Sequence, residues 1–233
     1  MAKCPQVLSL NQARNRFVVL SGMGSKQRDG RFSLSTVKQE TSIARVGLYK
    51  ILKAKDIVMK IAIAQTRPVK GDLSTNLKQH KQLIQLAVAN DADAIIFPEL
   101  SLTGYEPTLA KALATHPNDS RLDELQALSN DHQLTIGVGL PTQSDRNQCI
   151  SLVLFQPHQA RRTYSKKYLH PDEEAFFVSG PNFPVLIINE IPVGLAICYE
   201  LSIPEHAAAA YEHGAQLYVA SVAKTLDGVN RAS

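Results

Sequence analysis

The chain is poor in cysteine and lacks any long apolar run. Its three cysteines, Cys4, Cys149 and Cys198, are too few and too scattered for a disulfide framework, and they lack the close C-x-x-C pairing of a zinc site. No apolar run approaches the ~20 residues needed to cross a bilayer, and the N-terminus has no signal-peptide core. These absences favour a protein of the reducing cytoplasm, with neither a membrane nor a metal ion among its partners.

Basic charge is confined to one end of the chain. Residues 1–58 hold 11 Lys+Arg against 3 Asp+Glu, a net charge of +8, whereas residues 59–233 hold 14 against 18, a net charge of −4. A nucleic-acid-binding fold concentrates a basic patch on its folded surface. The mildly acidic main part of the chain therefore argues against a nucleic-acid partner.

The character of the sequence changes at Met59. Residues 1–58 show no sustained period of 2 or 3.6 and are rich in Ser, Gln, Lys and Arg. We therefore expect a basic, poorly structured extension over residues 1–58 and a folded domain over residues 59–233. Two further explanations of the change remain open: translation that begins at Met59, and an organellar transit peptide over residues 1–58.

Beyond Met59, buried strands alternate with helices, which predicts a layered α/β domain. Helices are expected from a cap at Asp72 or Ser74 to about residue 90, over 120–131 and near 204–213. Strands are expected at 60–66, 94–100 with a stop at Pro98, 134–139, 150–156 and 216–222, with a further pair over 185–197.

Cys198 ends an apolar run in GLAICYELSIPE, residues 194–205, and a polar turn follows it. Nucleophiles favour such junctions because the strand fixes the backbone while the turn exposes the side chain. Considered alone, a free cysteine is as readily a small buried hydrophobe. The chemistry therefore depends on what other residues the fold brings to the thiol.

Two charged residues occupy settings that suit such a thiol. Glu99 ends a buried strand in IIFPELSLTGYEP, where desolvation would raise the pKa of its carboxyl towards that of a general base. Lys166 lies in TYSKKYLHPDEEAFFVSG, and a buried ammonium is a suitable partner for a tetrahedral oxyanion. Alternatively, Glu99 faces solvent and Lys166 belongs to the solvated basic run from Arg161 to Lys167.

Together, Glu99, Lys166 and Cys198, in this order and with these flanks, resemble the nitrilase superfamily of carbon–nitrogen hydrolases. The resemblance runs from Met59 to the chain end. The matching positions are Glu99 in FPEL; Tyr164, Lys166 and Leu169, with Tyr168 where the family usually has His; Cys198, Tyr199, Glu200, Pro204 and Glu205; and Asp172, Glu173, Phe177 and Gly180, with Glu174 as the alternative to Glu173.

This resemblance implies a four-layer α-β-β-α sandwich, often paired into a homodimer, that hydrolyses a small linear amide, carbamoyl or nitrile compound. Cys198 would form a thioester, Glu99 would move protons and Lys166 would stabilise the oxyanion. The backbone N–H of Tyr199 would be a second oxyanion donor, and Glu173 would hold Lys166 or the substrate. No metal or organic cofactor is implied.

Several other residues in these motifs have plainer interpretations. Tyr105 and Phe177 are expected to be packing residues rather than substrate contacts. His170, Asp172 and Glu173 could suggest a metal site, but close spacing on a loop is not a ligand geometry.

The chain ends at Ser233, soon after the strand at 216–222. The family continues there with a helix, further strands and a segment that helps close the pocket, so the resemblance implies C-terminal truncation. Missing strands would leave sheet edges and apolar surface exposed. Three alternatives follow: an active hydrolase, an inactive fragment that keeps the motifs, and a non-catalytic binding module, which would not need an intact Glu-Lys-Cys set.

Overall fold

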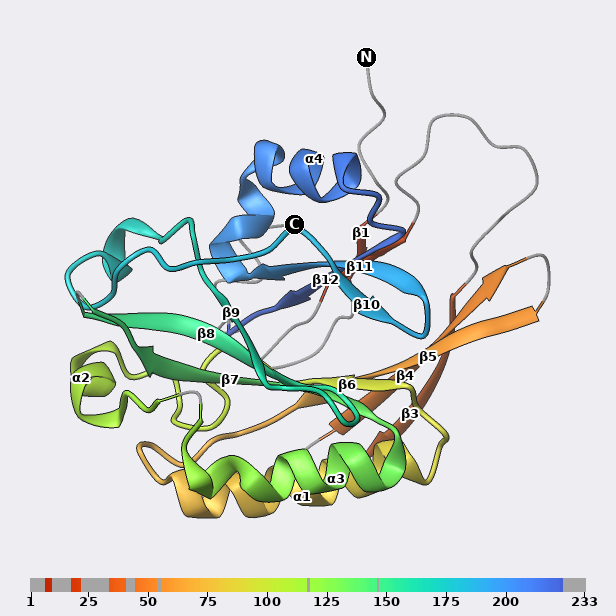
Figure 1. The fold of residues 1–233 in the computed structure, drawn as a ribbon, viewed down its shortest axis with the longest axis horizontal. Helices are drawn as coiled ribbons and strands as arrows, with labels where there is room; N and C mark the ends of the chain where they lie inside the picture. Colours follow the sequence, from red (N-terminus) through yellow and green to blue (C-terminus); the bar gives the residue numbers. More distant parts are fainter. Residues whose placement is uncertain are drawn as a thin grey trace.

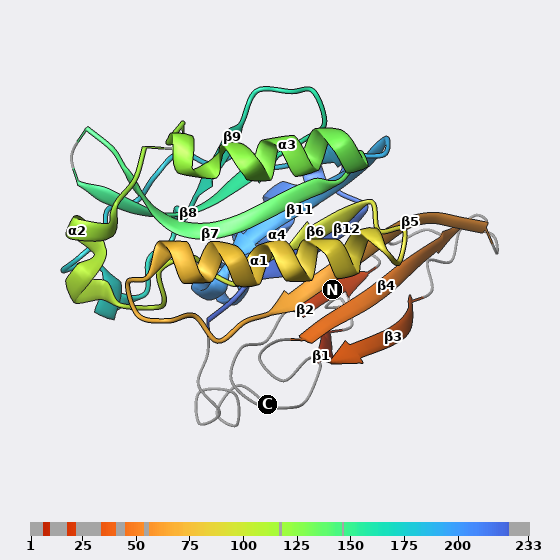
Figure 2. The ribbon, with the colours of Figure 1, turned by 90° about the horizontal axis from the view of Figure 1, so that it is seen from below.

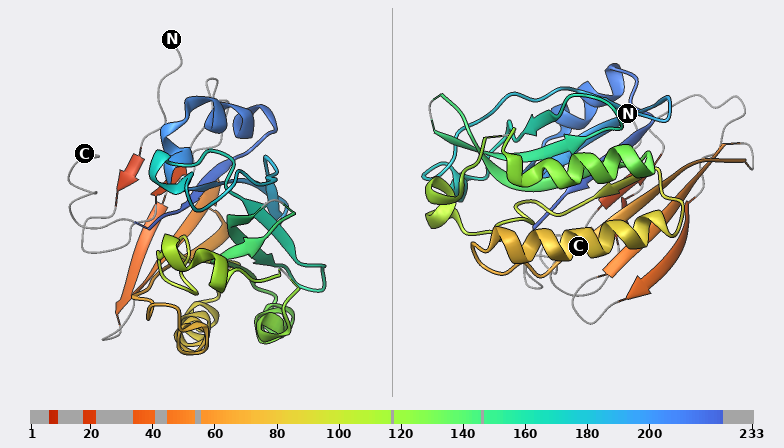
Figure 3. Two further views of the ribbon diagram at one scale, coloured as in Figure 1. Left: turned by 90° about the vertical axis from the view of Figure 1, so that its left-hand side faces the viewer. Right: turned by 60° about the horizontal axis from the view of Figure 1, so that its bottom comes forward.

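The computed structural model describes residues 7–9, 18–21, 34–40, 45–53, 56–116, 118–145 and 147–223. Within them, two β-sheets lie face to face with helices on their outer sides (Figure 1). Figure 3 shows the layers edge-on, with α4 (Pro204–Glu212) outside one sheet and α1 (Leu73–Val88) and α3 (Asp123–His132) outside the other. The expected α-β-β-α sandwich is confirmed.

The larger sheet has seven strands, and β5, β6 and β7 run parallel within it. Figure 2 shows α1 and α3 lying side by side across its outer face. In spatial order its strands are β3 (Leu34–Glu40), β4 (Arg45–Lys53), β5 (Asp56–Gln65), β6 (Ala94–Ile96), β7 (Thr135–Gln143), β8 (Gln148–Phe155) and β9 (Arg162–Ser165).

The smaller sheet has five strands, of which β11 and β12 are parallel. Its antiparallel pair β10 and β11 turns at Asn189 and Glu190, both of which have positive φ. In spatial order its strands are β1 (Val7–Ser9), β2 (Val18–Ser21), β12 (Leu217–Ser221), β11 (Ile191–Ile197) and β10 (Leu186–Ile188).

The two faces of β5 show how the sequence pattern builds the layers. Ile61 and Ile63 point into the core between the sheets, whereas Ala62 and Ala64 face the core beneath α1 and α3. This alternation follows from the two-residue period of a strand. The small alanine side chains let the helices pack closely on the sheet.

Most predicted elements form, with boundaries that shift by a few residues. The carboxylate of Asp72, not the side chain of Ser74, caps α1 by accepting from the backbone N–H of Thr75 at 2.9 Å. Helix α3 begins at Asp123 after a short 3₁₀ turn. Strand β6 ends at Ile96, just before Phe97 and Pro98. A short helix, α2 (Ala110–Leu113), was not expected.

Strand β4 departs from the expectation of a poorly structured extension over residues 1–58. It pairs with β5 along its whole length, and Val46, Leu48 and Tyr49 are buried. Val46 and Leu48 join the core beneath the helices and Tyr49 joins the core between the sheets. Because apolar residues serve both faces, the stretch lacks the one-sided alternation that would have revealed it. The division of the chain at Met59, which falls inside β5, stays a prediction.

Strands from the N-terminal segment also pair with both sheets. Strand β4 takes the side of β5 opposite β6, and β2 takes the side of β12 opposite β11. Neither β5 nor β12 therefore presents a free edge of the kind expected from a truncated sheet. In the described ranges, no helix is both long and apolar enough to span a membrane.

Candidate active site

The three predicted catalytic residues follow three strands that end in the same region. Lys166 comes directly after β9, Cys198 comes directly after β11, and Glu99 lies just beyond β6. Strands β6 and β9 belong to the larger sheet and β11 to the smaller one. The candidate site therefore lies between the two sheets, on backbone that both sheets fix.

The side chain of Lys166 joins two carboxylates. Its Nζ lies 2.8 Å from Oε1 of Glu99 and 2.8 Å from Oε1 of Glu173. The side chains of Lys166 and Glu99 are 0% exposed and that of Glu173 is 1% exposed. A buried ammonium needs such partners, because an unpaired charge in the interior is strongly unfavourable. The solvent-exposed alternatives for Glu99 and Lys166 are therefore wrong.

The thiol of Cys198 belongs to the same cluster. Glu99, Lys166 and Glu173 all lie close enough to act electrostatically on this thiol. Burial raises the pKa of Cys198 and so does the negative charge of Glu99, while Lys166 opposes the shift. The resting cysteine is thus a neutral thiol beside a proton acceptor. The residue as a whole is only partly buried.

The same burial shifts the two charged partners in useful directions. Desolvation raises the pKa of Glu99, against the opposing charge of Lys166, towards the range of a general base. Burial alone would lower the pKa of Lys166, but the adjacent Glu99, Cys198 and Glu173 outweigh it and the pKa rises. Lys166 therefore keeps its positive charge while Glu99 becomes easier to protonate.

The backbone at Cys198 is strained. Its φ is +45°, in the left-handed region that residues with a Cβ rarely adopt. Such a conformation costs on the order of 1 kcal/mol or more and requires support from its surroundings. The strain arises where β11 stops and a 3₁₀ turn, Cys198–Ser202, begins. This sharp turn directs the thiol away from the strand.

A glycine on β7 allows the loop of Glu99 to pack closely. A Cβ added to Gly139 would lie 2.2 Å from the carbonyl oxygen of Pro98, which is far inside contact distance. The backbone N–H of Leu102 donates to the carbonyl of Gly139 at 2.9 Å. On the other side, the hydroxyl of Ser221 donates to the carbonyl of Phe97 at 2.8 Å. Strands from both sheets therefore hold this loop.

Glu173, rather than the exposed Glu174, points into the cluster. Its Oε2 accepts from the backbone N–H of His170 at 2.8 Å, and its Oε1 also accepts from the hydroxyl of Tyr105 at 2.8 Å. Tyr105 is 42% exposed and its hydroxyl joins the site, and its expected role in packing rather than in substrate contact stays a prediction. Phe177 is buried in the core, as expected.

The remaining predicted residues lie beside this cluster. The ring of Tyr199 meets that of His170 edge to face, with centroids 5.2 Å apart, and the role of its backbone N–H stays a prediction. The carboxylate of Glu173 pairs with Lys166 instead of forming a metal site with the side chains of His170 and Asp172. Among the residues that the structure describes, no group of three or more His, Cys, Asp or Glu side chains could hold a metal ion.

Sequence reasoning gave no role to Glu200, although its position matched a motif. This carboxylate is fully buried beside the site and accepts hydrogen bonds from Tyr164 and from the backbone of Ile197 and Lys167. A signal was present in the sequence, because Glu200 lies two residues after Cys198 and matches the family motif. A carboxylate that merely faced solvent in a turn would not be expected to match a motif.

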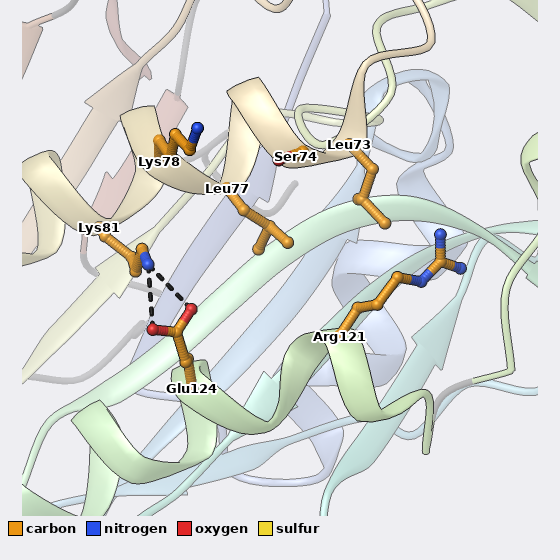
Figure 4. Close-up of a pocket in the computed structure, with 7 residues that line it drawn as sticks. All are labelled: Leu73, Ser74, Leu77, Lys78, Lys81, Arg121 and Glu124. Atoms are coloured by element: carbon orange, nitrogen blue, oxygen red, sulfur yellow. Dashed lines mark hydrogen bonds and ion pairs between the residues drawn. The ribbon is translucent and has the colours of Figure 1, made fainter.

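A separate depression of about 350 Å³ lies on the outer face of the molecule, between α1 and α3 (Figure 4). Leu73 and Leu77 line it, and Lys81 and Glu124 close one end with an ion pair at 2.8 Å. The helices here cover the side of the larger sheet that faces away from the smaller one. The depression shares no lining residue with the candidate active site.

The structure is thus an α-β-β-α sandwich with Glu99, Lys166 and Cys198 brought together between its two sheets. The carbon–nitrogen hydrolase family matches residues 60–231, and the chain belongs to that family. The match covers every predicted catalytic residue.

Individual relatives are amidases and related enzymes. An (R)-stereoselective amidase of a Pseudomonas species is 28% identical over 69% of this chain and 59% of its own length. A glutamine-dependent NAD(+) synthetase of Thermotoga maritima is 25% identical over 67% of this chain and 28% of its own. The chain spans about 60% of the length of the first of these relatives.

Solved structures of an amidase are also similar to this chain. An amidase from a Nesterenkonia species superposes with a TM-score of 0.63 at 28% identity, over 70% of this chain and 64% of that one. A mutant of that amidase, 27% identical to this chain with the same TM-score, shows covalent addition of the acetamide moiety of fluoroacetamide at its active-site cysteine.

Proposed function

We propose that this protein hydrolyses the carbon–nitrogen bond of a small linear amide through a thioester on Cys198. The observation that carries the proposal is the shared ammonium of Lys166, 2.8 Å from Glu99 and from Glu173, beside the thiol of Cys198, whose pKa is raised by the charge of Glu99. A proton acceptor, a nucleophile and a fixed positive charge meet at one point. This is the set of groups that acyl transfer from an amide needs.

In the first half of the reaction, Glu99 takes the proton of the Cys198 thiol while the sulfur attacks the amide carbon. The carbonyl oxygen becomes an oxyanion, which Lys166 and the backbone N–H of Tyr199 stabilise. Glu99 then gives its proton to the amide nitrogen. The carbon–nitrogen bond breaks, ammonia or an amine leaves, and a thioester joins the acyl group to Cys198.

In the second half, Glu99 takes a proton from water as the water oxygen attacks the thioester carbon. The carbon–sulfur bond breaks, the carboxylic acid leaves and the proton returns to the sulfur of Cys198. Glu173 keeps Lys166 in place throughout, because it shares the ammonium with Glu99 at the same distance. A carbamoyl compound or a nitrile would use the same groups.

The test is release of ammonia by the full chain from a panel of small amides, including acetamide, acrylamide and butyramide. Related structures contain butyramide and acrylamide at 27% and 26% identity, which supports amides of this size as first substrates. We expect ammonia release by the wild type and a fall in kcat below about one-thousandth in Cys198→Ala.

Fluoroacetamide provides a readout that does not need turnover. Its carbon would bond to the sulfur of Cys198 as fluoride leaves, and intact-protein mass spectrometry would detect one added acetamide moiety. Cys149→Ser is the matched control, since that residue is only 2% exposed and its thiol should not be labelled. Wild-type turnover in Cys198→Ala would refute the mechanism, and a folded wild type that neither turns over amides nor is labelled would favour the inactive fragment.

A further inference from the structure

A second buried carboxylate lies next to the catalytic cluster. Glu200 is 0% exposed. Its Oε2 accepts from the backbone N–H of Ile197 at 2.8 Å and from the hydroxyl of Tyr164 at 2.9 Å. Its Oε1 accepts from the backbone N–H of Lys167 at 2.8 Å, with a longer contact of 3.4 Å from that of Tyr168. Both oxygens are therefore occupied by donors from different segments.

Those donors directly flank the two residues that carry the chemistry. Ile197 precedes the nucleophile Cys198, and Lys167 follows the oxyanion partner Lys166. Ile197 ends β11 of the smaller sheet, whereas Lys167 follows the end of β9 in the larger sheet. One carboxylate thus bridges the two strand ends on which the thiol and the ammonium are mounted.

The bridge also supports the strained turn at the nucleophile. Cys198 has a φ of +45°, and a residue with a Cβ keeps such a conformation only where its surroundings hold it. The bond from the N–H of Ile197 to Glu200 closes the turn immediately around Cys198. Loss of this bond would let the turn relax and the thiol move.

A further layer fixes the carboxylate itself. The Nε2 atom of His206 lies 2.8 Å from the hydroxyl of Tyr164, and its Nδ1 atom lies 2.5 Å from the hydroxyl of Tyr218. Burial lowers the pKa of His206, although the charge of Glu200 opposes the shift. Glu200 is therefore held by N–H and O–H donors, in contrast to the catalytic carboxylates on Lys166.

We propose that Glu200 is a positioning residue that sets the placement of Cys198 relative to Lys166 by bridging the backbone beyond β9 and the backbone before Cys198. This role rests on the proposed function. A glutamate is required because each oxygen accepts a backbone N–H. A glutamine would place its own N–H₂ against one of these donors, and an aspartate is one methylene too short to keep both contacts.

The test compares Glu200→Gln and Glu200→Asp with Glu212→Gln, which changes an exposed glutamate on α4 outside the family motifs and serves as the matched control. Circular dichroism and thermal unfolding first establish that each variant is folded. For folded Glu200→Gln we expect kcat for a small amide to fall about 100-fold with KM changed less than about threefold, since misplacement of about 1 Å has that effect. The rate of fluoroacetamide labelling of Cys198 should fall in parallel.

Two features keep the proposal separable from its alternatives. Labelling of Cys198 does not require turnover, so it tests the role of Glu200 even if the wild type releases no ammonia. The absence of ammonia release would count against the proposed function alone. If Glu200→Gln does not fold, Tyr164→Phe removes one donor to Glu200, and we expect a smaller loss of kcat and labelling rate at unchanged KM. The proposal would be overturned if folded Glu200→Gln were labelled at the wild-type rate. If Glu200→Gln does not fold, wild-type kcat and labelling rate in Tyr164→Phe would overturn it.

Discussion

Two clusters form around buried carboxylates in this protein, one around Glu99 and Glu173 and the other around Glu200. The negative charge is stabilised differently in each. Glu99 and Glu173 share the ammonium of Lys166, whereas Glu200 is held by two backbone N–H groups and a tyrosine hydroxyl. Consecutive residues serve the two clusters. Lys166 contributes its buried side chain to the first, and Lys167 contributes its backbone N–H to the second while its side chain is exposed.

The difference bears on which carboxylate would move a proton in the proposed reaction. Two carboxylates on one ammonium leave negative charge beside the thiol, and burial raises the pKa of Glu99, so this group can accept and return a proton. Glu200 bonds to donors on separate segments, so its contacts define geometry. One cluster therefore suits chemistry and the other suits alignment.

The sharpest way to break this comparison is to remove the charge on Lys166 and on Lys167 in turn. Lys166→Met leaves Glu99 and Glu173 buried without a cation, which we expect to cost about 3–5 kcal/mol in the free energy of unfolding. Lys167→Met keeps the backbone donor to Glu200 and should change the free energy of unfolding by less than about 0.5 kcal/mol. Urea denaturation measures both, and similar losses in the two variants would contradict the difference between the clusters.

The next test isolates the proton acceptor. Glu99→Gln keeps the shape of the side chain but cannot take a proton, so kcat for a small amide should fall by about 10²–10⁴-fold. Because the pKa of Glu99 is raised, the acid limb of kcat/KM in the wild type should lie above the ordinary glutamate value of 4.5. Below that limb Glu99 is protonated and cannot accept the thiol proton, so the rate falls as pH falls.

A stopped assay of ammonia across pH, with Glu212→Gln as the control, measures this limb. A wild-type limb at or below 4.5 would show that Glu99 is not perturbed in solution. A Glu99→Gln variant with wild-type kcat would assign the base to another group. Glu173, the other carboxylate bound to Lys166, would then be the candidate.

Sequence patterns predicted the ordered core and the location of the candidate site well. Apolar runs that stop at a polar residue mark the limits of buried strands, and they predicted the strands that end at Ile96, before Glu99, and at Ile197, before Cys198. Strand β9, which ends before Lys166, has the sequence RTYS and was not predicted, so only the family resemblance indicated Lys166. The period of the helix from Asp72 predicted α1 in the same way. These signals are local, and each can be recognised within one segment.

The features that sequence reasoning missed depend on contacts between distant segments. Strand β4 is buried by pairing with β5 and packing on both faces, and its own composition shows no one-sided pattern. Glu200 acquires its partners from Tyr164 and Lys167, more than thirty residues away. Tyr105 was missed because an aromatic residue in a loop usually contributes packing, and only the fold places its hydroxyl on Glu173.

The smallest expected effect concerns that tyrosine. Tyr105→Phe removes the hydroxyl that donates to Glu173 while Glu173 keeps its bonds to Lys166 and to the N–H of His170. The lost bond is worth about 1 kcal/mol, so kcat/KM should fall about fivefold. Tyr211→Phe is the matched control, since Tyr211 on α4 is 45% exposed, close to the 42% of Tyr105. Equal kcat/KM in the two variants would show that Tyr105 does not help to hold Glu173 in the first cluster, which would then rest on Lys166 and its two carboxylates.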